Sequence, residues 1–262
     1  MNLKGKTILL TGASNGLGRA LAAALDAHEC RLLLVARSAD KLDNLLSDLH
    51  TPGSRSFSCD LSDLHARSRL VGEIVNSEPH LDLLILNAGI GSHSRLDQLT
   101  AEEVREVLQL NTVAPLELTA GLLHLLPHGE PAGIVYIGSL AGELTTPGMS
   151  LYSASKAALH TFSRAVDIEL TADKHFSLLV ILGAMSGTNF GDNIRHPRSG
   201  QPAWYRRLDV DAEQAASLII KAIQQQKPQL VIPAWYGGML MLSRLLAPLT
   251  RAVTYYSYRR LW

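Results

Sequence analysis

Cysteine is scarce in this sequence: among 262 residues only Cys30 and Cys59 occur, both expected at buried strand ends. Two cysteines cannot form a disulfide framework and these two lack metal-ligand spacing, so a reducing cytoplasm is the simplest setting. The ten histidines form no metal-binding motif either, and we expect His160 and His175 to be structural, as surface or helix residues. We therefore predict no metal site.

An excess of either charge is also missing, since 24 Lys and Arg balance 24 Asp and Glu. This balance gives no electrostatic footprint for nucleic acid, so no nucleic-acid partner is expected. Residues 1–6 lead directly into a short apolar run, without the long apolar segment and small-residue cleavage site of a signal peptide. We expect a cytoplasmic protein that is not exported by that route.

Seven short apolar runs alternate with longer segments of helical periodicity. The apolar runs span residues 7–10, 32–36, 56–59, 81–86, 133–137, 177–182 and 230–232. The helical segments span residues 17–27, 39–49, 63–75, 101–126, 150–170 and 212–225. Near-continuous apolar strands separated by helices are typical of a parallel sheet covered on both faces. We predict an α/β fold with a doubly wound, seven-stranded parallel sheet in one domain over residues 1–233.

A glycine-rich loop follows the first predicted strand and opens the first predicted helix. Its sequence is Thr11-Gly12-Ala13-Ser14-Asn15-Gly16-Leu17-Gly18. Three glycines let the backbone turn tightly and approach a pyrophosphate, and the N-terminus of the following helix presents free N–H groups to the anion. The alternative is a glycine-rich turn without a ligand, but its place after the first strand favours a dinucleotide site.

The end of the second predicted strand indicates which dinucleotide is bound. An acidic residue there would bind the ribose 2′-hydroxyl and repel a 2′-phosphate, whereas this chain has Ala36-Arg37-Ser38. The guanidinium of Arg37 suits a phosphate, so we expect NADP(H) rather than NAD(H). The alternative is that Arg37 is a solvated residue at a helix start.

A tyrosine, a lysine and a serine form a candidate proton-transfer site. Tyr152 and Lys156 are four residues apart, which places phenol and ammonium on one face of a helix, and Ser139 lies thirteen residues upstream of the tyrosine. The cation would favour the phenolate, so we expect it to lower the pKa of Tyr152 toward neutrality.

Taken together, five separated motifs resemble the short-chain dehydrogenase/reductase family in its single-domain form, over about residues 4–233. They are residues 11–18, Asp60, Asn87-Ala88-Gly89, Asn111, and Ser139 with Tyr152 and Lys156. The resemblance implies a Rossmann-type fold, a small-molecule substrate with a carbonyl or alcohol group, and a homodimer or homotetramer packed through residues 101–126 and 150–170.

The resemblance also implies a role for each catalytic residue. Tyr152 would transfer the proton to or from the substrate oxygen, and Ser139 would hydrogen-bond that oxygen. Lys156 would hold the nicotinamide ribose and tune the tyrosine, while Asn111 would hold a helix distortion and a relay water. The duller alternatives are a strand-end cap for Ser139 and an ordinary helix polar residue for Asn111.

The implied cofactor set is larger, and two of its positions depart from the family pattern. Asp60 and the Leu61 backbone would meet the adenine, unless Asp60 merely caps the next helix. After the sixth strand Leu182-Gly183 replaces the Pro-Gly that is usual in the family. Thr188 lies one residue farther along the chain than the threonine that usually meets the nicotinamide carboxamide. The expected cofactor contacts are Gly12, Ser14, Asn15, Gly16, Leu17, Gly18, Arg37, Asp60, Leu61, Asn87, Ala88, Gly89, Tyr152, Lys156, Gly183 and Thr188.

Two later segments concern the substrate and the membrane. Residues 186–208 are rich in Gly, Pro, Asn and Arg and are expected to form a substrate lid, beside the apolar Leu144, Met149 and Ala184. The alternative is a mobile basic loop with no specific role in recognition. Residues 234–262 form an apolar and basic extension, which fits a helix lying in a membrane interface or one covering a partner or its own core.

These observations predict an NADP(H)-dependent oxidoreductase that interconverts a carbonyl and a secondary alcohol on an apolar substrate. The cytoplasmic enzyme would be peripheral on a membrane if the extension binds lipid. The competing class is a non-catalytic, membrane-recruited NADP(H)-binding regulator. Retention of Asn111, Ser139, Tyr152 and Lys156 argues against the regulator, which would not need all four.

Overall fold

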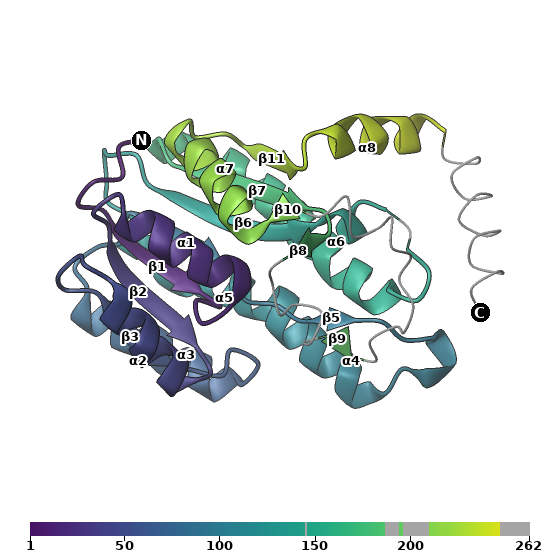
Figure 1. Cartoon of the computed structure of the whole chain (residues 1–262), viewed down its shortest axis with the longest axis horizontal. Helices are drawn as coiled ribbons and strands as arrows, with labels where there is room; N and C mark the ends of the chain where they lie inside the picture. Colours follow the sequence, from purple (N-terminus) through teal and green to yellow (C-terminus); the bar gives the residue numbers. More distant parts are fainter. Residues whose placement is uncertain (145, 187–193, 196–209, 247–262) are drawn as a thin grey trace.

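The computed structural model of the chain describes residues 1–144, 146–186, 194–195 and 210–246. Its main strands are β1 (Thr7–Thr11), β2 (Arg31–Ala36), β3 (Arg55–Ser58), β4 (Leu83–Leu86), β6 (Gly133–Ser139), β7 (Phe176–Leu182) and β11 (Gln229–Ile232). They form one sheet in the order β11-β7-β6-β4-β1-β2-β3 (Figure 1), and every neighbouring pair is parallel. The predicted seven-stranded parallel sheet is confirmed.

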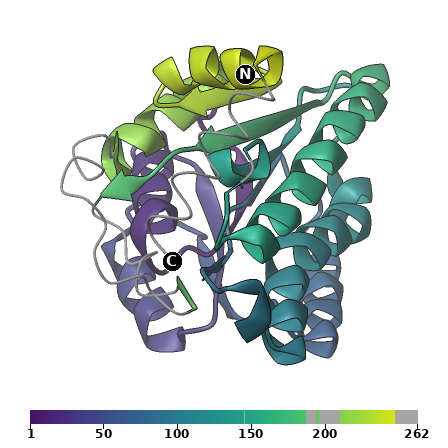
Figure 2. The same cartoon turned by 90° about the vertical axis from the view of Figure 1, so that its right-hand side faces the viewer.

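Helices cover both faces of this sheet, as Figure 2 shows with the sheet between two helical layers. One face carries α1 (Gly16–Asp26), α2 (Ala39–Asp48) and α7 (Ala212–Gln224), and the other carries α3 (Leu64–Ser77), α4 (Ala101–Leu108), α5 (Ala114–Leu122) and α6 (Ser150–Leu170). Side chains of a strand alternate between these layers: Ile8 and Leu10 pack with the first group, and Leu9 packs with the second. This alternation confirms the doubly wound α/β architecture.

The helix predicted over residues 101–126 is wrong in its continuity. After α4 the chain forms a π-helical turn, Gln109–Val113, then α5, and then a 3₁₀ turn, Leu123–Leu125. Within the π turn, the side chain of Asn111 bonds both backbone groups of Ile90, which holds the extra residue in place. The family resemblance implied a helix distortion at Asn111, and periodicity alone could not show it.

Two short strand pairs were missed because two-residue strands leave no periodic pattern. β5 (Gly91–Ser92) pairs with β9 (Ile194–Arg195), and β8 (Met185–Ser186) pairs with β10 (Val210–Asp211). Apart from these residues, the predicted lid over residues 186–208 lies outside the described part of the chain.

The helix α8 (Trp235–Leu245) begins the predicted C-terminal extension and follows β11 directly. Tyr236 and Leu240 are buried, and Leu240 joins the core on the α3 to α6 face. Trp235, Met241 and Leu242 are exposed. Residues 247–262 lie outside the described part. None of the described helices is long and apolar enough to cross a membrane.

Candidate active site

The site lies where the winding of the sheet changes direction, between β1 and β4. The chain winds outward from β1 through β2 to β3, then returns to β4 on the opposite side of β1. The loops leaving these two strands therefore diverge and open a crevice at the carboxyl edge of the sheet. They are the glycine-rich loop and the segment beginning at Asn87.

The glycine-rich loop has no room for a side chain at Gly12 or Gly18. Gly12 and Gly16 have positive φ angles of +67° and +47°. A β-carbon on Gly18 would lie 2.0 Å from the carbonyl oxygen of Gly12, and one on Gly12 would lie 2.9 Å from the Cα of Ala88. Asn15 precedes α1 without a side-chain capping bond. The first amides of α1 therefore remain open to an anion, which fits a pyrophosphate.

The side chains around this loop include a cation that the sequence reasoning missed. The amide of Asn15 donates to the Ser14 hydroxyl over 3.3 Å, and the ammonium of Lys41 donates to the Asn15 oxygen over 3.1 Å. Leu17 points into the core. Arg37 is exposed at the end of β2 and forms no ion pair with any residue in the described ranges.

A single hydroxyl, that of Thr11, joins the ends of β1 and β4. It donates to the Ile85 carbonyl over 3.4 Å and accepts from the backbone N–H groups of Asn87 and Ala88 over 2.9 and 3.1 Å. The side-chain amide of Asn87 donates back to the carbonyls of Thr11 and Gly12. Thr11 was absent from the predicted set, although its place at the strand end was a usable signal.

The predicted adenine contacts follow β3. The carboxylate of Asp60 accepts from the backbone and hydroxyl of Ser62 over 2.9 and 2.7 Å. Asp60 does not cap α3, because Asp63 is the N-cap. Leu61 is buried, and its carbonyl accepts a 2.7 Å bond from the buried guanidinium of Arg67.

The candidate proton-transfer residues meet at the carboxyl end of β6. Tyr152 and Lys156 are 5% and 4% exposed on α6, and Ser139 is the last residue of β6. Tyr152 and Ser139 share a side-chain hydrogen bond. The ammonium of Lys156 donates to the Ile137 carbonyl over 2.9 Å and lies 6.0 Å from the centre of the Tyr152 ring. The helix therefore presents phenol and ammonium on one face, as their spacing predicted.

The expected lowering of the pKa of Tyr152 is not found. Burial raises the pKa of Tyr152 to about 12, against the opposing effect of its hydrogen bond with Ser139. Burial also lowers the pKa of Lys156 to about 8. Removing both groups from water disfavours their charged forms, and this burial is the main cause of both shifts.

Asn111 lies beside this group, in the π turn. Its side-chain oxygen accepts from the Ile90 N–H over 2.9 Å, and its nitrogen donates to the Ile90 carbonyl over 2.8 Å and to Ser155 Oγ over 3.1 Å. A β-carbon on Gly89 would come within 3.1 Å of the Asn111 oxygen and 3.4 Å of the Lys156 ammonium. Gly89 therefore keeps open the space between these two polar groups.

His160 is a helix residue as expected, but it is buried at 1% exposure, so a surface position is wrong. One ring nitrogen accepts from the backbone N–H of Ser139 and the other faces Glu143. His175 is buried too, and it accepts from the backbone of Ala132 over 3.3 Å. The missed signal for His160 was its spacing of four residues from Lys156 along the same helix face.

The exit of β7 retains its turn without the usual proline. The N–H of Gly183 donates to the Ile232 carbonyl over 2.7 Å, and a β-carbon on Gly183 would lie 2.3 Å from the ring of Tyr236 in α8. Thr188 lies outside the described residues. The residues expected beside the substrate are all half-buried: Leu144, Met149 and Ala184.

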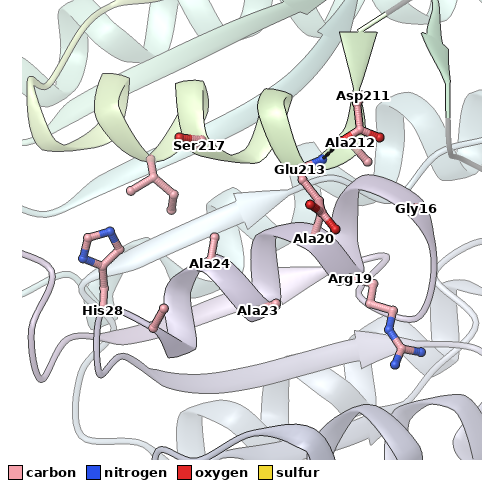
Figure 3. Close-up of a pocket in the computed structure, with 12 residues that line it drawn as sticks. Gly16, Arg19, Ala20, Ala23, Ala24, His28, Asp211, Ala212, Glu213 and Ser217 are labelled. Carbon is pink, nitrogen blue, oxygen red and sulfur yellow. Dashed lines mark hydrogen bonds between the residues drawn. The ribbon is translucent and has the colours of Figure 1, made fainter.

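A groove of about 620 Å³ lies between α1 and α7 (Figure 3), and none of the proton-transfer residues lines it. Its floor along α1 is formed by small side chains, among them Ala20, Ala23 and Ala24. Gly16 is the one member of the predicted cofactor set that lines it.

Comparison with known proteins agrees with this architecture. The family model described as short chain dehydrogenase matches residues 6–199. The chain is 32% identical to a fatty acyl-CoA reductase of Acinetobacter baylyi over 94% of this chain and 82% of that protein. It is similar to a solved short-chain dehydrogenase from Burkholderia cenocepacia in complex with NADP, with a TM-score of 0.76 and 27% identity over 88% of this chain and 98% of that one.

A second solved structure, a short-chain dehydrogenase/reductase from Burkholderia phymatum in complex with NAD, has a TM-score of 0.82 and 22% identity, over 95% of this chain and 96% of that one. At this identity it supports the fold alone. The family match and the 32% identical relative show that the chain belongs to the short-chain dehydrogenase family, a family of NAD(P)-binding oxidoreductases.

Proposed function

We propose that this protein is an NADP(H)-dependent oxidoreductase that interconverts a carbonyl and a secondary alcohol on an apolar substrate. The observation that carries the proposal is the convergence of Ser139, Tyr152, Lys156 and Asn111 beside the crevice at the carboxyl edge of the sheet. Sites of this kind are defined by the mutual geometry of their acid, base and orienting groups.

The protonation of Tyr152 supports a role as acid in the reducing direction. With its pKa raised to about 12, the phenol carries its proton at neutral pH and can deliver it to a carbonyl oxygen. Ser139 would donate a hydrogen bond to the same oxygen. The nicotinamide, when bound, supplies the hydride to the carbonyl carbon. Lys156 and the open amides of α1 would hold the ribose and the pyrophosphate.

The preference for NADP(H) rests on charge at the end of β2. Arg37 is exposed and forms no ion pair within the described residues, and Lys41 reaches the phosphate loop through Asn15. A cation at the end of β2 and a second one at the loop favour a phosphorylated ribose. An apolar substrate agrees with Leu144, Met149 and Ala184 and with the likeness to a fatty acyl-CoA reductase.

The experiment is a substrate screen followed by one substitution. Ketones, aldehydes and long-chain acyl-CoA thioesters are incubated with NADPH, and turnover is followed by loss of NADPH absorbance. With a substrate in hand, Tyr152→Phe should reduce kcat at least about 10²-fold, because it removes the transferred proton. NADPH affinity, measured by fluorescence titration, should change little. Undiminished turnover in Tyr152→Phe would exclude the proposed mechanism.

Cofactor preference is tested separately with Arg37→Asp. The carboxylate should repel the 2′-phosphate, so kcat/KM for NADPH should fall at least about tenfold relative to that for NADH. Arg69→Asp, in α3, provides a matched charge control with unchanged preference. If Arg37→Asp leaves the NADPH to NADH ratio unchanged, Arg37 does not determine the cofactor.

A further inference from the structure

The imidazole of His160 lies buried directly behind Ser139, enclosed by two glycines. A β-carbon on Gly138 would lie 2.3 Å from its Nε2, and one on Gly142 would lie 2.7 Å from its Cε1. The ring therefore fills a space that exists only because both flanking positions lack side chains. Nothing in the proposed chemistry uses this group.

The contacts of the ring define which nitrogen carries the proton. The backbone N–H of Ser139 points to Nε2 over 3.2 Å, and an amide can only donate, so Nε2 is the acceptor. The proton is then on Nδ1, which donates to the carboxylate of Glu143 over 3.0 Å. Arg164 forms an ion pair with the same carboxylate. A continuous chain of contacts runs from Arg164 through Glu143 and His160 to the backbone of Ser139.

The hydroxyl of Ser139 is held at a second point. Its oxygen accepts from the N–H of Ala141 over 3.2 Å, which uses one lone pair and leaves the hydroxyl proton to donate toward Tyr152 or a substrate. The bond to His160 holds the backbone of Ser139, and the bond from Ala141 holds its side-chain hydroxyl. Such preorganisation is what a donor to a reacting oxygen requires.

We propose that His160, oriented by Glu143, is a positioning residue that holds the backbone of Ser139 and thereby the hydroxyl that binds the substrate oxygen. The proposal rests on the function above, since Ser139 is assigned there to that oxygen. It adds two residues, His160 and Glu143, whose effect on turnover passes through Ser139 alone.

A matched control is present at the other end of the same strand. His175 is also buried, and its Nδ1 accepts from the backbone N–H of Ala132 over 3.3 Å, immediately before β6 begins. Substituting His175 removes the same kind of hydrogen bond from the residue that precedes this strand, at the opposite end from Ser139. It therefore reports the structural cost alone.

The first experiment requires no turnover. Full-length protein labelled with ¹⁵N in its histidines is examined by NMR between pH 6 and pH 8, with His160→Gln used to assign the signals. The proposal expects the Nδ1–H form of a neutral ring throughout. An Nε2–H form cannot accept from Ser139 and would overturn it. If the wild type reduces no substrate, the proposed function fails, while this measurement still decides whether His160 accepts the hydrogen bond of the Ser139 backbone.

The second experiment is a double-mutant cycle with an active substrate. His160→Leu should lower kcat about tenfold with little change in the KM for NADPH, and His160→Gln, which keeps an acceptor oxygen, should recover part of the loss. In a Ser139→Ala background, His160→Leu should cost less than about twofold. An equal cost in both backgrounds, or an equal loss in His175→Leu, would overturn the proposal. If His160→Leu does not fold, His160→Gln and Glu143→Gln complete the cycle.

Discussion

Part of the destabilisation of this protein by acid should come from one buried side chain, His160. Burial lowers the pKa of His160 from its ordinary 6.5 to about 4, so the folded state resists a proton that the unfolded chain accepts. Because the unfolded state binds the proton first, the free energy of unfolding falls as the pH falls through this interval. From these two pKa values, the loss between pH 7.5 and pH 5 is about 2 kcal/mol.

The perturbation that isolates this contribution is His160→Gln, which does not titrate. Urea unfolding at intervals between pH 7.5 and pH 5, followed by circular dichroism, gives the free energy of unfolding of both proteins. The buried His175, which does not contact His160, titrates in both proteins, so its contribution cancels in the difference. The variant should be less stable at pH 7.5, and the gap should shrink by about 2 kcal/mol at pH 5.

Parallel pH curves for the two proteins would refute this reasoning, because they would mean that His160 binds no more protons in the unfolded state than in the folded one. A gap that widens as the pH falls would imply that the ring is protonated in the folded state. Either result would also contradict the neutral ring on which the contact with Ser139 depends.

The remaining predictions concern glycines. Gly18→Ala places a β-carbon 2.0 Å from the carbonyl of Gly12, so NADPH affinity in a fluorescence titration should fall at least about tenfold. The control Gly72→Ala in α3 meets nothing within 4 Å and should leave binding unchanged while raising stability to urea by up to about 1 kcal/mol. Gly183→Ala should destabilise the protein by about 1–3 kcal/mol through its clash with Tyr236, and Gly183→Ala should cost less in a Tyr236→Ala background; additive costs would contradict the contact.

The sheet was predictable because its central strands are near-continuous apolar runs, and burial on both faces requires such runs. The ends of elements and the two-residue strands were not, since they depend on single hydrogen bonds such as that of Gly183 to Ile232. The break in the helix over residues 101–126 was likewise invisible to periodicity. It depends on the contact between Asn111 and Ile90, which are distant in sequence.

The sequence predicted which residues form the candidate site, but it did not predict their pKa values. The spacing of Tyr152 and Lys156 is local, so their common helix face followed from sequence. Their pKa values did not, because desolvation depends on how completely the fold covers them. Thr11 and His160 had positional signals in the sequence, but their contacts did not follow from it, because each bonds backbone groups and a sequence does not display the partners of a backbone amide.

The contact between Tyr236 and Gly183 ties α8 to the sheet that precedes it. The ring occupies the space over the exit of β7, and Leu240, four residues later, belongs to the core. A chain shortened at Pro233 would uncover that exit and leave a hole in the core, so any loss of binding or activity would be ambiguous. Truncation after residue 246 keeps these contacts. A change of activity or membrane binding in that shortened chain can therefore be assigned to residues 247–262 and not to a damaged core.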